Sequence, residues 1–337
     1  MAPQDALSGT YLEVGTMDEL SDDARRRRSF LGLAAAAVPL TAAVVTGGGA
    51  TAAFADSRSS TSSGTAGRSG AGGRVGVLAD TQGVTLSTGT VPAGLVTFEV
   101  STAETAQQAV GLLRLTDGVQ LADYLAHYVQ AATAASAADR AAGVALIDAE
   151  AFYFGGAAVL AGSGRGTVTV TLPPGEYVLV NYSAVALPGF AAGVRLLRVV
   201  PARGPYGRPP QADDIAAQYD QGTQGLFLVS ARLAARGSLQ VTNHSSQLNE
   251  LMIVPVVPGT TAAQVTAFCD AVAAGQYPSS SPLAGTPVGL TPLSPGATAY
   301  YSYSLPAGPY LVTSFISDRR TGVKEMFENM WALTELR

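Results

Sequence analysis

A long segment occurs twice in this chain, and this duplication constrains the fold more than any other feature of the sequence. The run LVTFEVSTAETAQQAVGLLRLTDG matches RGSLQVTNHSSQLNELMIVPVVPG at an offset of 141 positions, which places Val100 on Val241. Further on, TVTVTLPPGEYVLV matches TAYYSYSLPAGPYLV at an offset of 133 positions, which places Gly175 on Gly308. The offsets differ because the segment between the two matches changes in length, as loops tolerate. We therefore expect two similar domains in tandem.

Each copy has the pattern of a sheet. The first contains short runs rich in β-branched and apolar residues, each ended by Gly, Pro or Asp: VTLST, LVTFEVS, VGLLRL, TVTVTL and EYVLVNY. Such runs indicate strands of an antiparallel sandwich. Between the third and fourth runs, Leu121, Tyr124, Leu125 and Tyr128 recur at helical spacing, and AAQVTAFCDAVAAG follows the matching strand of the second copy. The predicted fold class is mainly β, with two antiparallel Greek-key β-sandwiches, each with a helical insert.

Composition shifts give the expected boundaries. SRSSTSSGTAGRSGAGGR has too few apolar residues to form a core, and ARGPYGRPPQADD is rich in Pro and Gly. We expect a signal peptide over 1–55, a flexible Ser/Gly linker over 56–74, domain 1 over 75–200, a second linker over 201–224 and domain 2 over 225–337.

The N-terminal region resembles a twin-arginine export signal. RRRRSFLG, which includes Arg27, Arg28, Phe30 and Leu31, precedes a weakly apolar Ala-rich stretch. In TAAFADS, the small residues Ala53 and Ala55 suit cleavage by a signal peptidase after Ala55. The alternative, an uncleaved membrane anchor, is disfavoured because Pro39 and a run of Gly interrupt the stretch. The resemblance implies export to the cell envelope or beyond, with membrane contact only through the signal.

Charge and composition exclude several classes of function. From Asp56 onward the chain has 16 Arg and Lys residues against 19 Asp and Glu residues, and no basic block follows residue 28, so nucleic acid is not an expected partner. With one cysteine and two histidines, neither a disulfide framework within one chain nor a zinc site of Cys and His is possible. The chain has no G-x-S-x-G, P-loop or H-E-x-x-H motif, and no cofactor is expected.

The repeated unit resembles the cupredoxin-like family, the plastocyanin and azurin type of sandwich. The resemblance covers roughly 75–200 and 225–337, and it rests on the order of VTN and NELM, a helical insert, PAGPYLV and a closing loop. Members of this family hold copper with two His, one Cys and one Met, because thiolate and imidazole suit copper. The resemblance therefore implies a copper site at one end of each sandwich.

Carried over to this sequence, the copper ligands are missing. In the second copy the first His position is Asn249, the Cys position is Ser314, the second His position is Glu325, and Met330 stands at the axial Met position. In the first copy Gln108 stands at the first His position and Asn181 at the Cys position. The closing loop is shorter there, and the second His and axial Met positions fall near Gly189 and Val194. Neither a serine nor an asparagine side chain can replace a metal thiolate.

Other residues admit both a functional and a structural interpretation. Asn249, Glu325 and Met330 are the metal candidates, and together with Glu250 and Ser314 they could bind a hard cation such as calcium or merely cap strands. Single residues are expected to have ordinary roles: His244 as a solvated loop residue, His127 on a helix surface and Cys269 as a buried apolar residue. Two aromatic groups either line a cleft or pack in the core: Phe152, Tyr153 and Phe154; and Tyr300, Tyr301 and Tyr303.

The function expected from the sequence is that of an exported, non-catalytic binding or structural protein with an unidentified ligand in the cell envelope or outside the cell. One alternative is a metal-binding or electron-transfer cupredoxin with an atypical site in domain 2. Another is an enzyme whose site has no recognisable motif.

Overall fold

The computed structural model describes residues 73–161, 165–202, 206–222, 224–276 and 278–337. The predicted signal residues Arg27, Arg28, Phe30 and Leu31, the predicted cleavage residues Ala53 and Ala55, and the linker up to residue 72 lie outside these ranges. Among the helices in the described ranges, none has both the length and the apolar character needed to cross a bilayer.

The first repeat contains nine strands and two α-helices. Its elements are β1 (Gly73–Asp80), β2 (Gly83–Leu86), β3 (Thr90–Pro92), β4 (Gly94–Ser101), β5 (Gln108–Leu115), α2 (Leu121–Thr133), α3 (Ala137–Glu150), β6 (Ala151–Val159), β7 (Gly166–Leu172), β8 (Gly175–Asn181), the 3₁₀ helices η1 (Tyr182–Ala184) and η2 (Phe190–Gly193), and β9 (Arg195–Val200).

The second repeat follows the same order with one α-helix. Its elements are β10 (Asp214–Gln221), β11 (Gln224–Leu228), β12 (Arg232–Leu233), β13 (Arg236–Asn243), β14 (Asn249–Pro255), α4 (Ala262–Ala273), β15 (Val288–Leu293), β16 (Thr298–Ser304), β17 (Gly308–Thr313), the 3₁₀ helix η3 (Glu325–Glu328) and β18 (Trp331–Leu336).

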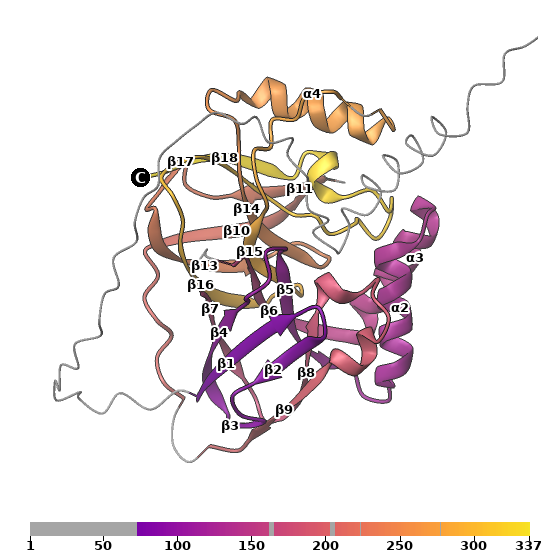
Figure 1. Cartoon of the computed structure of the whole chain (residues 1–337), viewed down its shortest axis with the longest axis vertical. Helices are drawn as coiled ribbons and strands as arrows, with labels where there is room; N and C mark the ends of the chain where they lie inside the picture. Colours follow the sequence, from indigo (N-terminus) through magenta and orange to yellow (C-terminus); the bar gives the residue numbers. More distant parts are fainter. Residues whose placement is uncertain (1–72, 162–164, 203–205, 223, 277) are drawn as a thin grey trace, which may run out of the picture.

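Two sheets run through both repeats and face each other across one core (Figure 1). The first has the order β11-β10-β13-β16-β7-β4-β1-β2, and the second has the order β12-β18-β17-β14-β15-β6-β5-β8-β9-β3. The repeats meet where β16 pairs with β7 and β15 pairs with β6. The predicted fold class, mainly β with two sandwiches, is confirmed, and the sandwiches share both of their sheets.

The pairing registers reproduce the duplication found in the sequence. Leu95 pairs with Thr171 in the first repeat, and Arg236 pairs with Ser304 in the second. Arg236 lies 141 positions after Leu95, and Ser304 lies 133 positions after Thr171, so the two pairs are related by the same offsets as the repeated segments. The turns before β8 and β17 also match, because the Tyr177 hydroxyl donates to the carbonyl of Pro173 (2.7 Å) and the Tyr310 hydroxyl donates to the carbonyl of Pro306 (2.9 Å).

Glycines allow two strands to approach closely at equivalent points of the repeats. A Cβ atom on Gly156 would lie 2.0 Å from the carbonyl oxygen of Val110, and one on Gly289 would lie 2.1 Å from that of Leu251. Both contacts are with the backbone of the neighbouring strand, so a side chain at either position would force the strands apart.

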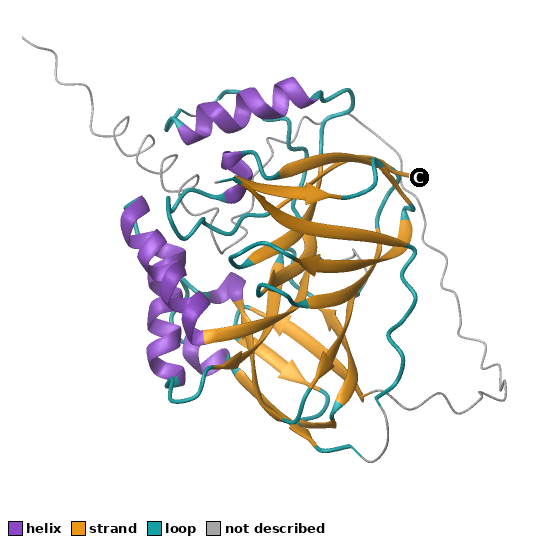
Figure 2. Ribbon diagram, turned by 180° about the vertical axis from the view of Figure 1, so that it is seen from behind, coloured by secondary structure: helices purple, strands orange, loops and turns teal. Residues whose placement is uncertain are grey.

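The helices form a layer on the outer face of the ten-stranded sheet (Figure 2). One buried cluster contains Tyr124 and Tyr128 of α2 together with Val180 of β8, and it also contains Val265 and Phe268 of α4 with Leu311 of β17. The predicted helical inserts are thus present, with two helices in the first repeat and one in the second.

Three details differ from the expectations. The sheets are mixed: most of the strand pairs are antiparallel as predicted, but β1 pairs with β4 and β10 pairs with β13 in parallel. Alternation of apolar residues reports which face is buried but not the direction of the neighbouring strand. Part of the linker expected over 201–224 is a strand, because Asp214–Gln221 forms β10. The strand β1 begins at Gly73, inside the range 56–74 expected to be flexible. The buried residues of β10 are Ala216, Ala217 and Gln218, and none of them is a β-branched or aromatic residue that would signal a strand.

Candidate functional site

In the first repeat the two positions expected to hold copper ligands are bonded to each other. Asn181 ends β8, and its Nδ2 donates to Oε1 of Gln108 (2.7 Å) and to the carbonyl oxygen of Asp80 (2.7 Å). Its Oδ1 accepts from the backbone N–H of Ser183 (3.2 Å). Gln108 and Asn181 are both buried. An amide pair therefore occupies the centre of this end of the sandwich.

The closing loop of the first repeat offers no polar side chain at the remaining two positions. Gly189 precedes η2 with a left-handed backbone (φ 84°), and Val194 follows η2. Neither residue carries a group that coordinates a metal through its side chain.

In the second repeat, Ser314 lies directly after β17 and is fully buried. Its Oγ accepts from the backbone N–H groups of Glu250 and Ile316, each at 3.4 Å. These distances are long for an oxygen acceptor. Two backbone donors thus converge on the position where the resemblance places a thiolate.

Glu325 and Met330 are brought together by the loop between β17 and β18. Both side chains are fully buried, and the Met330 N–H donates to the carbonyl of Glu325 (2.9 Å). They converge over Gly225, where an added Cβ would lie 2.4 Å from Sδ of Met330 and 3.0 Å from Oε2 of Glu325. A glycine at 225 leaves space for both groups.

Asn249 joins these residues through a neighbouring loop. Its Nδ2 donates to Oγ of Ser245 (2.9 Å), which donates to the carbonyl of Gln247 (3.1 Å). The amide of Gln247 in turn donates to Oε1 of Glu325 and to Oδ2 of Asp318 (3.0 Å). The metal candidates Asn249 and Glu325 are therefore linked through Ser245 and Gln247.

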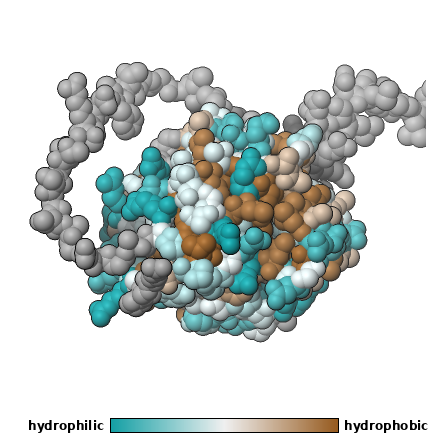
Figure 3. Space-filling model, turned by 90° about the horizontal axis from the view of Figure 1, so that it is seen from below, coloured by the Kyte–Doolittle hydropathy of each residue, from teal (hydrophilic) through white to brown (hydrophobic). Residues whose placement is uncertain are grey.

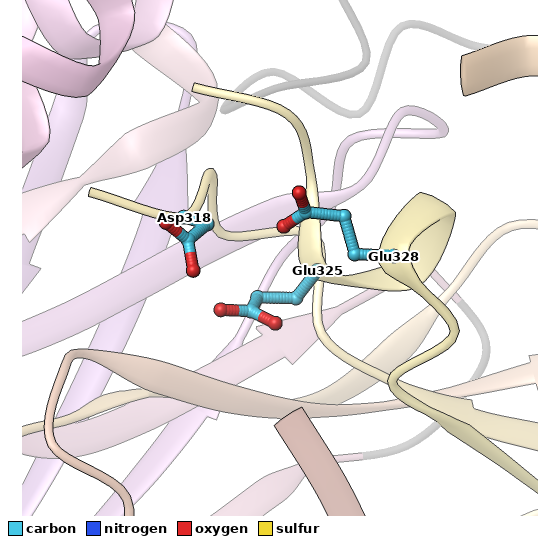
Figure 4. A group of neighbouring side chains, drawn as sticks. All are labelled: Asp318, Glu325 and Glu328. Atoms are coloured by element: carbon cyan, nitrogen blue, oxygen red, sulfur yellow. The ribbon is translucent and has the colours of Figure 1, made fainter. Parts of the chain in front are cut away.

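A carboxylate cluster lies at this end of the second repeat, and sequence reasoning missed two of its members. Asp318, Glu325 and Glu328 each offer an oxygen, and these oxygens lie within 4.8 Å of one another (Figure 4). All three come from the β17–β18 loop and η3. The spacing of Glu325 and Glu328, three residues apart, is the signal that could have indicated a shared face of a helical turn.

The pKa values of the three carboxyl groups are shifted in different directions. Burial, followed by the charges of Asp318 and Glu328, raises the pKa of Glu325 to about 8, and burial also raises the pKa of Glu328. Burial alone would raise the pKa of Asp318, but hydrogen bonds from Arg320 and Gln247 lower it below its ordinary value. Nη2 of Arg320 and Oδ2 of Asp318 form an ion pair at 2.5 Å.

Glu250 and Lys324 are a second buried ionisable pair. Oε1 of Glu250 accepts from the N–H of Phe315 (3.0 Å), and Nζ of Lys324 donates to the carbonyl of Phe315 (3.2 Å). Burial raises the pKa of Glu250 to about 7, although the Phe315 hydrogen bond and Lys324 act in the opposite direction. Burial lowers the pKa of Lys324 to about 7. Glu250 and Lys324 therefore both form hydrogen bonds with the backbone of Phe315.

The other candidates lie elsewhere. Nδ1 of His127 on α2 contacts Oε1 of Glu150 at the end of α3 (2.8 Å). The exposed His244 stacks on Tyr219, with ring centroids 4.8 Å apart. Cys269 is buried in α4, and burial raises the pKa of its thiol to about 12, so it stays protonated at neutral pH. These residues therefore do not form one site.

Most of the aromatic residues singled out in the sequence belong to the interior. Tyr153, Tyr301 and Tyr303 are buried, whereas Phe152 is exposed and its ring packs at a tilt against that of Phe154, with centroids 4.8 Å apart. Core packing accounts for the buried tyrosines better than a ligand cleft does.

No protein-family model matches this chain, and no curated protein matches it significantly. Among solved structures, an auracyanin from the photosynthetic bacterium Roseiflexus castenholzii is 17% identical over 38% of this chain and 99% of its own, with a TM-score of 0.21. A copper nitrite reductase from Nitrosomonas europaea is 12% identical over 78% of this chain and 93% of its own, with a TM-score of 0.21. A multi-copper oxidase from Pediococcus acidilactici is 11% identical over 78% of this chain and 58% of its own, with a TM-score of 0.23. At these identities and scores the likeness says nothing of what this chain binds, and its fold, a mainly β double sandwich, is described by its own strand topology.

Proposed function

We propose that this chain is an exported, non-catalytic binding or structural protein in which the copper-ligand positions have become parts of hydrogen-bonded cores. The observation that carries the proposal is the bond between Asn181 and Gln108, which joins two expected ligand positions directly at 2.7 Å. A metal ion between the two side chains would have to break this bond. The amide pair instead holds the end of the first sandwich together.

The chemistry of the donors supports the same proposal. Copper sites of this fold depend on a thiolate and imidazoles, whereas the residues at those positions offer amide, hydroxyl and carboxylate oxygens. Ser314 adds a hydroxyl that is itself held by two backbone donors. Only the thioether of Met330 is a soft ligand, and a thioether alone binds copper weakly.

A binding role is supported by the surface. Figure 3 shows hydrophobic surface gathered among polar residues on one face of the molecule. Several large apolar residues are exposed in the described ranges, among them Leu196 of β9 (57%) and Ile215 of β10 (61%). Exposed apolar surface of this kind favours contact with a partner over a purely structural role. The partner we propose is an unidentified component of the cell envelope or the medium.

A second candidate, metal binding in the second repeat, is favoured by one observation. Glu325 Oε2 and Met330 Sδ converge over Gly225, as two ligands of one ion would. This candidate predicts a metal that is lost when Met330 is replaced.

Elemental analysis of the protein recovered after export, without chelators or added metal, tests these proposals. We expect no stoichiometric copper in the wild type or in an Asn249→Ala, Met330→Ala double variant, and an intact mass that begins at Asp56. About one copper per chain, absent from the double variant, would replace the proposed function with copper handling or electron transfer. An intact mass that retains residues 1–55 would contradict cleavage of the signal.

A further inference from the structure

The outer face of the eight-stranded sheet is open to solvent in the described part of the chain. The described α-helices pack instead on the ten-stranded sheet (Figure 2). On the four central strands β13, β16, β7 and β4, which lie side by side in Figure 1, alternate residues are buried and the residues between them point outward. These outward residues are mostly Thr and Ser, and among them only Glu99 and Arg236 carry a charge. This face therefore presents mainly hydroxyl groups.

The pairing registers align one outward residue from each of the four strands. Gln240 of β13 pairs with Tyr300 of β16, and Tyr300 pairs with Thr169 of β7. Thr169 pairs in turn with Thr97 of β4, and we call these four residues the Tyr300 row. The registers continue the row onto β10 and β1, so at about 4.8 Å between neighbouring strands it is about 24 Å long. Sheet twist rotates the strands about such a row and leaves the row itself nearly straight, so an extended molecule can lie along it.

Hydrogen bonds between strands hold some of these hydroxyl groups in place. Oγ1 of Thr97 and Oγ1 of Thr169 are bonded at 2.9 Å, and Oγ1 of Thr242 and Oγ1 of Thr298 are also bonded at 2.9 Å. Two hydroxyl groups joined by one hydrogen bond still offer one proton to donate and three lone pairs to accept. Because threonine has few side-chain rotamers, such a pair loses little conformational entropy when it binds a ligand.

Charge is confined to the margins of this face. Glu99, near the end of β4, forms ion pairs with Arg74 and with Arg165 (2.9 Å). Arg236, the first residue of β13, donates to Oγ of Ser304 (3.3 Å). A face that binds a charged polymer needs exposed charges of the opposite sign along the contact, and the Tyr300 row has none. The charge distribution therefore matches a neutral ligand.

We propose that this face binds an extended, neutral polysaccharide chain along the Tyr300 row. The hydroxyl groups of the row and the amide of Gln240 both donate and accept hydrogen bonds, as sugar hydroxyls do. Tyr300 is half-buried, unlike the buried Tyr301 and Tyr303, and it offers an apolar ring for the C–H face of a sugar together with a polar hydroxyl. The inference rests on the binding role in the proposed function and names the class of partner.

A protein partner fits this face less well. The centres of protein interfaces are enriched in aromatic residues, Met and Arg, whereas the Tyr300 row has one ring and three uncharged polar side chains. The strongly exposed Ile215 lies at one end of the row, on β10, and not in its middle. The middle of the row therefore suits sugar hydroxyls better than an apolar protein surface.

The test measures binding of the full chain to three insoluble polysaccharides that are neutral and extended: amorphous cellulose, xylan and chitin. We expect at least one of them to remove the protein from solution in a saturable manner. Binding should be as strong in concentrated NaCl as in dilute buffer, because salt weakens only attraction between charges. Calcium polygalacturonate, an insoluble anionic polysaccharide, is the control support and should retain little protein.

Two pairs of variants locate the binding face. Tyr300→Ala should weaken binding about tenfold by removing the ring, and Phe152→Ala, at an exposed ring on β6 of the other sheet, is its matched control. Thr169→Lys should weaken binding by a similar factor, because a long, charged side chain then stands in the middle of the row. Its control is Thr133→Lys, at an exposed position on α2 in the helical layer. Both controls should bind as the wild type does, and the melting temperature of each variant checks that it is folded.

Failure of all three neutral polysaccharides to retain the protein would overturn the proposal. Loss of binding in concentrated NaCl, or equal binding to polygalacturonate, would overturn it as well, because the contact would then depend on charge. Binding of wild-type strength by either Tyr300→Ala or Thr169→Lys would show that the polysaccharide lies on another face.

These outcomes are distinct from failure of the proposed function. Stoichiometric copper in the exported protein would contradict the proposed function, whatever the polysaccharides retain. A copper-free protein that none of the three polysaccharides retains would contradict only the inference about the Tyr300 row.

Discussion

Two buried residues occupy positions at which the resemblance to cupredoxins places a copper ligand. At position 181 the chain has an amide, and at position 314 it has a hydroxyl, where the resemblance places thiolates. In each case the polar group is buried and bonded within the protein: Asn181 to Gln108, and Ser314 to backbone N–H groups. At both positions the polar side chain thus takes part in the hydrogen bonds that organise the end of its repeat.

Gly156 gives a prediction at the residue scale. Replacing it with alanine puts a Cβ 2.0 Å from the carbonyl oxygen of Val110, and β5 and β6 must then separate. We expect Gly156→Ala to lower the free energy of unfolding by about 3 kcal/mol, measured by urea denaturation. The control is Gly89→Ala, where nothing lies within 4 Å of the added atom, with an expected change below about 0.5 kcal/mol. Equal effects of the two substitutions would contradict the close approach of the strands.

Glu250 predicts a pH dependence. Its pKa is raised from 4.5 to about 7, so its contribution to stability is fully present below pH 4.5 and is lost as the pH rises through 7. Lys324, with a pKa lowered to about 7, acts in the opposite direction and above this window, between about pH 7 and its ordinary value of 10.5. Between pH 4.5 and 7, Glu250→Gln should therefore gain stability relative to the wild type.

The expected gain is on the order of 2–3 kcal/mol across that window, from the size of the shift. Urea denaturation of both proteins at several pH values measures it. A difference between variant and wild type that does not change with pH would show that Glu250 ionises in the folded protein as it does in the unfolded chain.

At the scale of elements, alternation in the sequence was sufficient to predict strands such as TVTVTL and LVTFEVS, because it reports burial of one face. It was insufficient for β10, whose buried residues are two alanines and a glutamine. It was also insufficient for the parallel pairing of β1 with β4, because strand direction depends on the route of the chain.

The residues of the candidate site were also predictable from the sequence only in part. Positions Asn249, Ser314, Glu325 and Met330 followed from a resemblance of strand order, which places residues near one end of a sandwich. The approach of Asp318 and Glu328 to Glu325 depends on how the β17–β18 loop turns into η3, and on Gln247 from a separate loop. Contacts of that kind depend on long-range packing, which one-dimensional patterns do not encode.

At the scale of the whole molecule, the repeats form one body. Both sheets cross from one repeat to the other, and the buried core contains residues of both, such as Val168 of β7 and Tyr301 of β16. The continuous sheets place the ends that carry Asn181 and Ser314 on a common frame. The proposed function implies that ligand residues alone, and not the scaffold, decide whether this molecule holds copper.

Titration with Cu²⁺, followed by visible absorption, tests this central claim most directly. The wild-type full chain is compared with a variant that restores the expected ligands of the second repeat, Asn249→His, Ser314→Cys, Glu325→His, beside the natural Met330. We predict no thiolate-to-copper absorption in the wild type and a stoichiometric absorption band in the variant, because the backbone donors at position 314 and the axial Met330 are already in place. Stoichiometric copper binding by the wild type, abolished by Met330→Ala, would contradict the account.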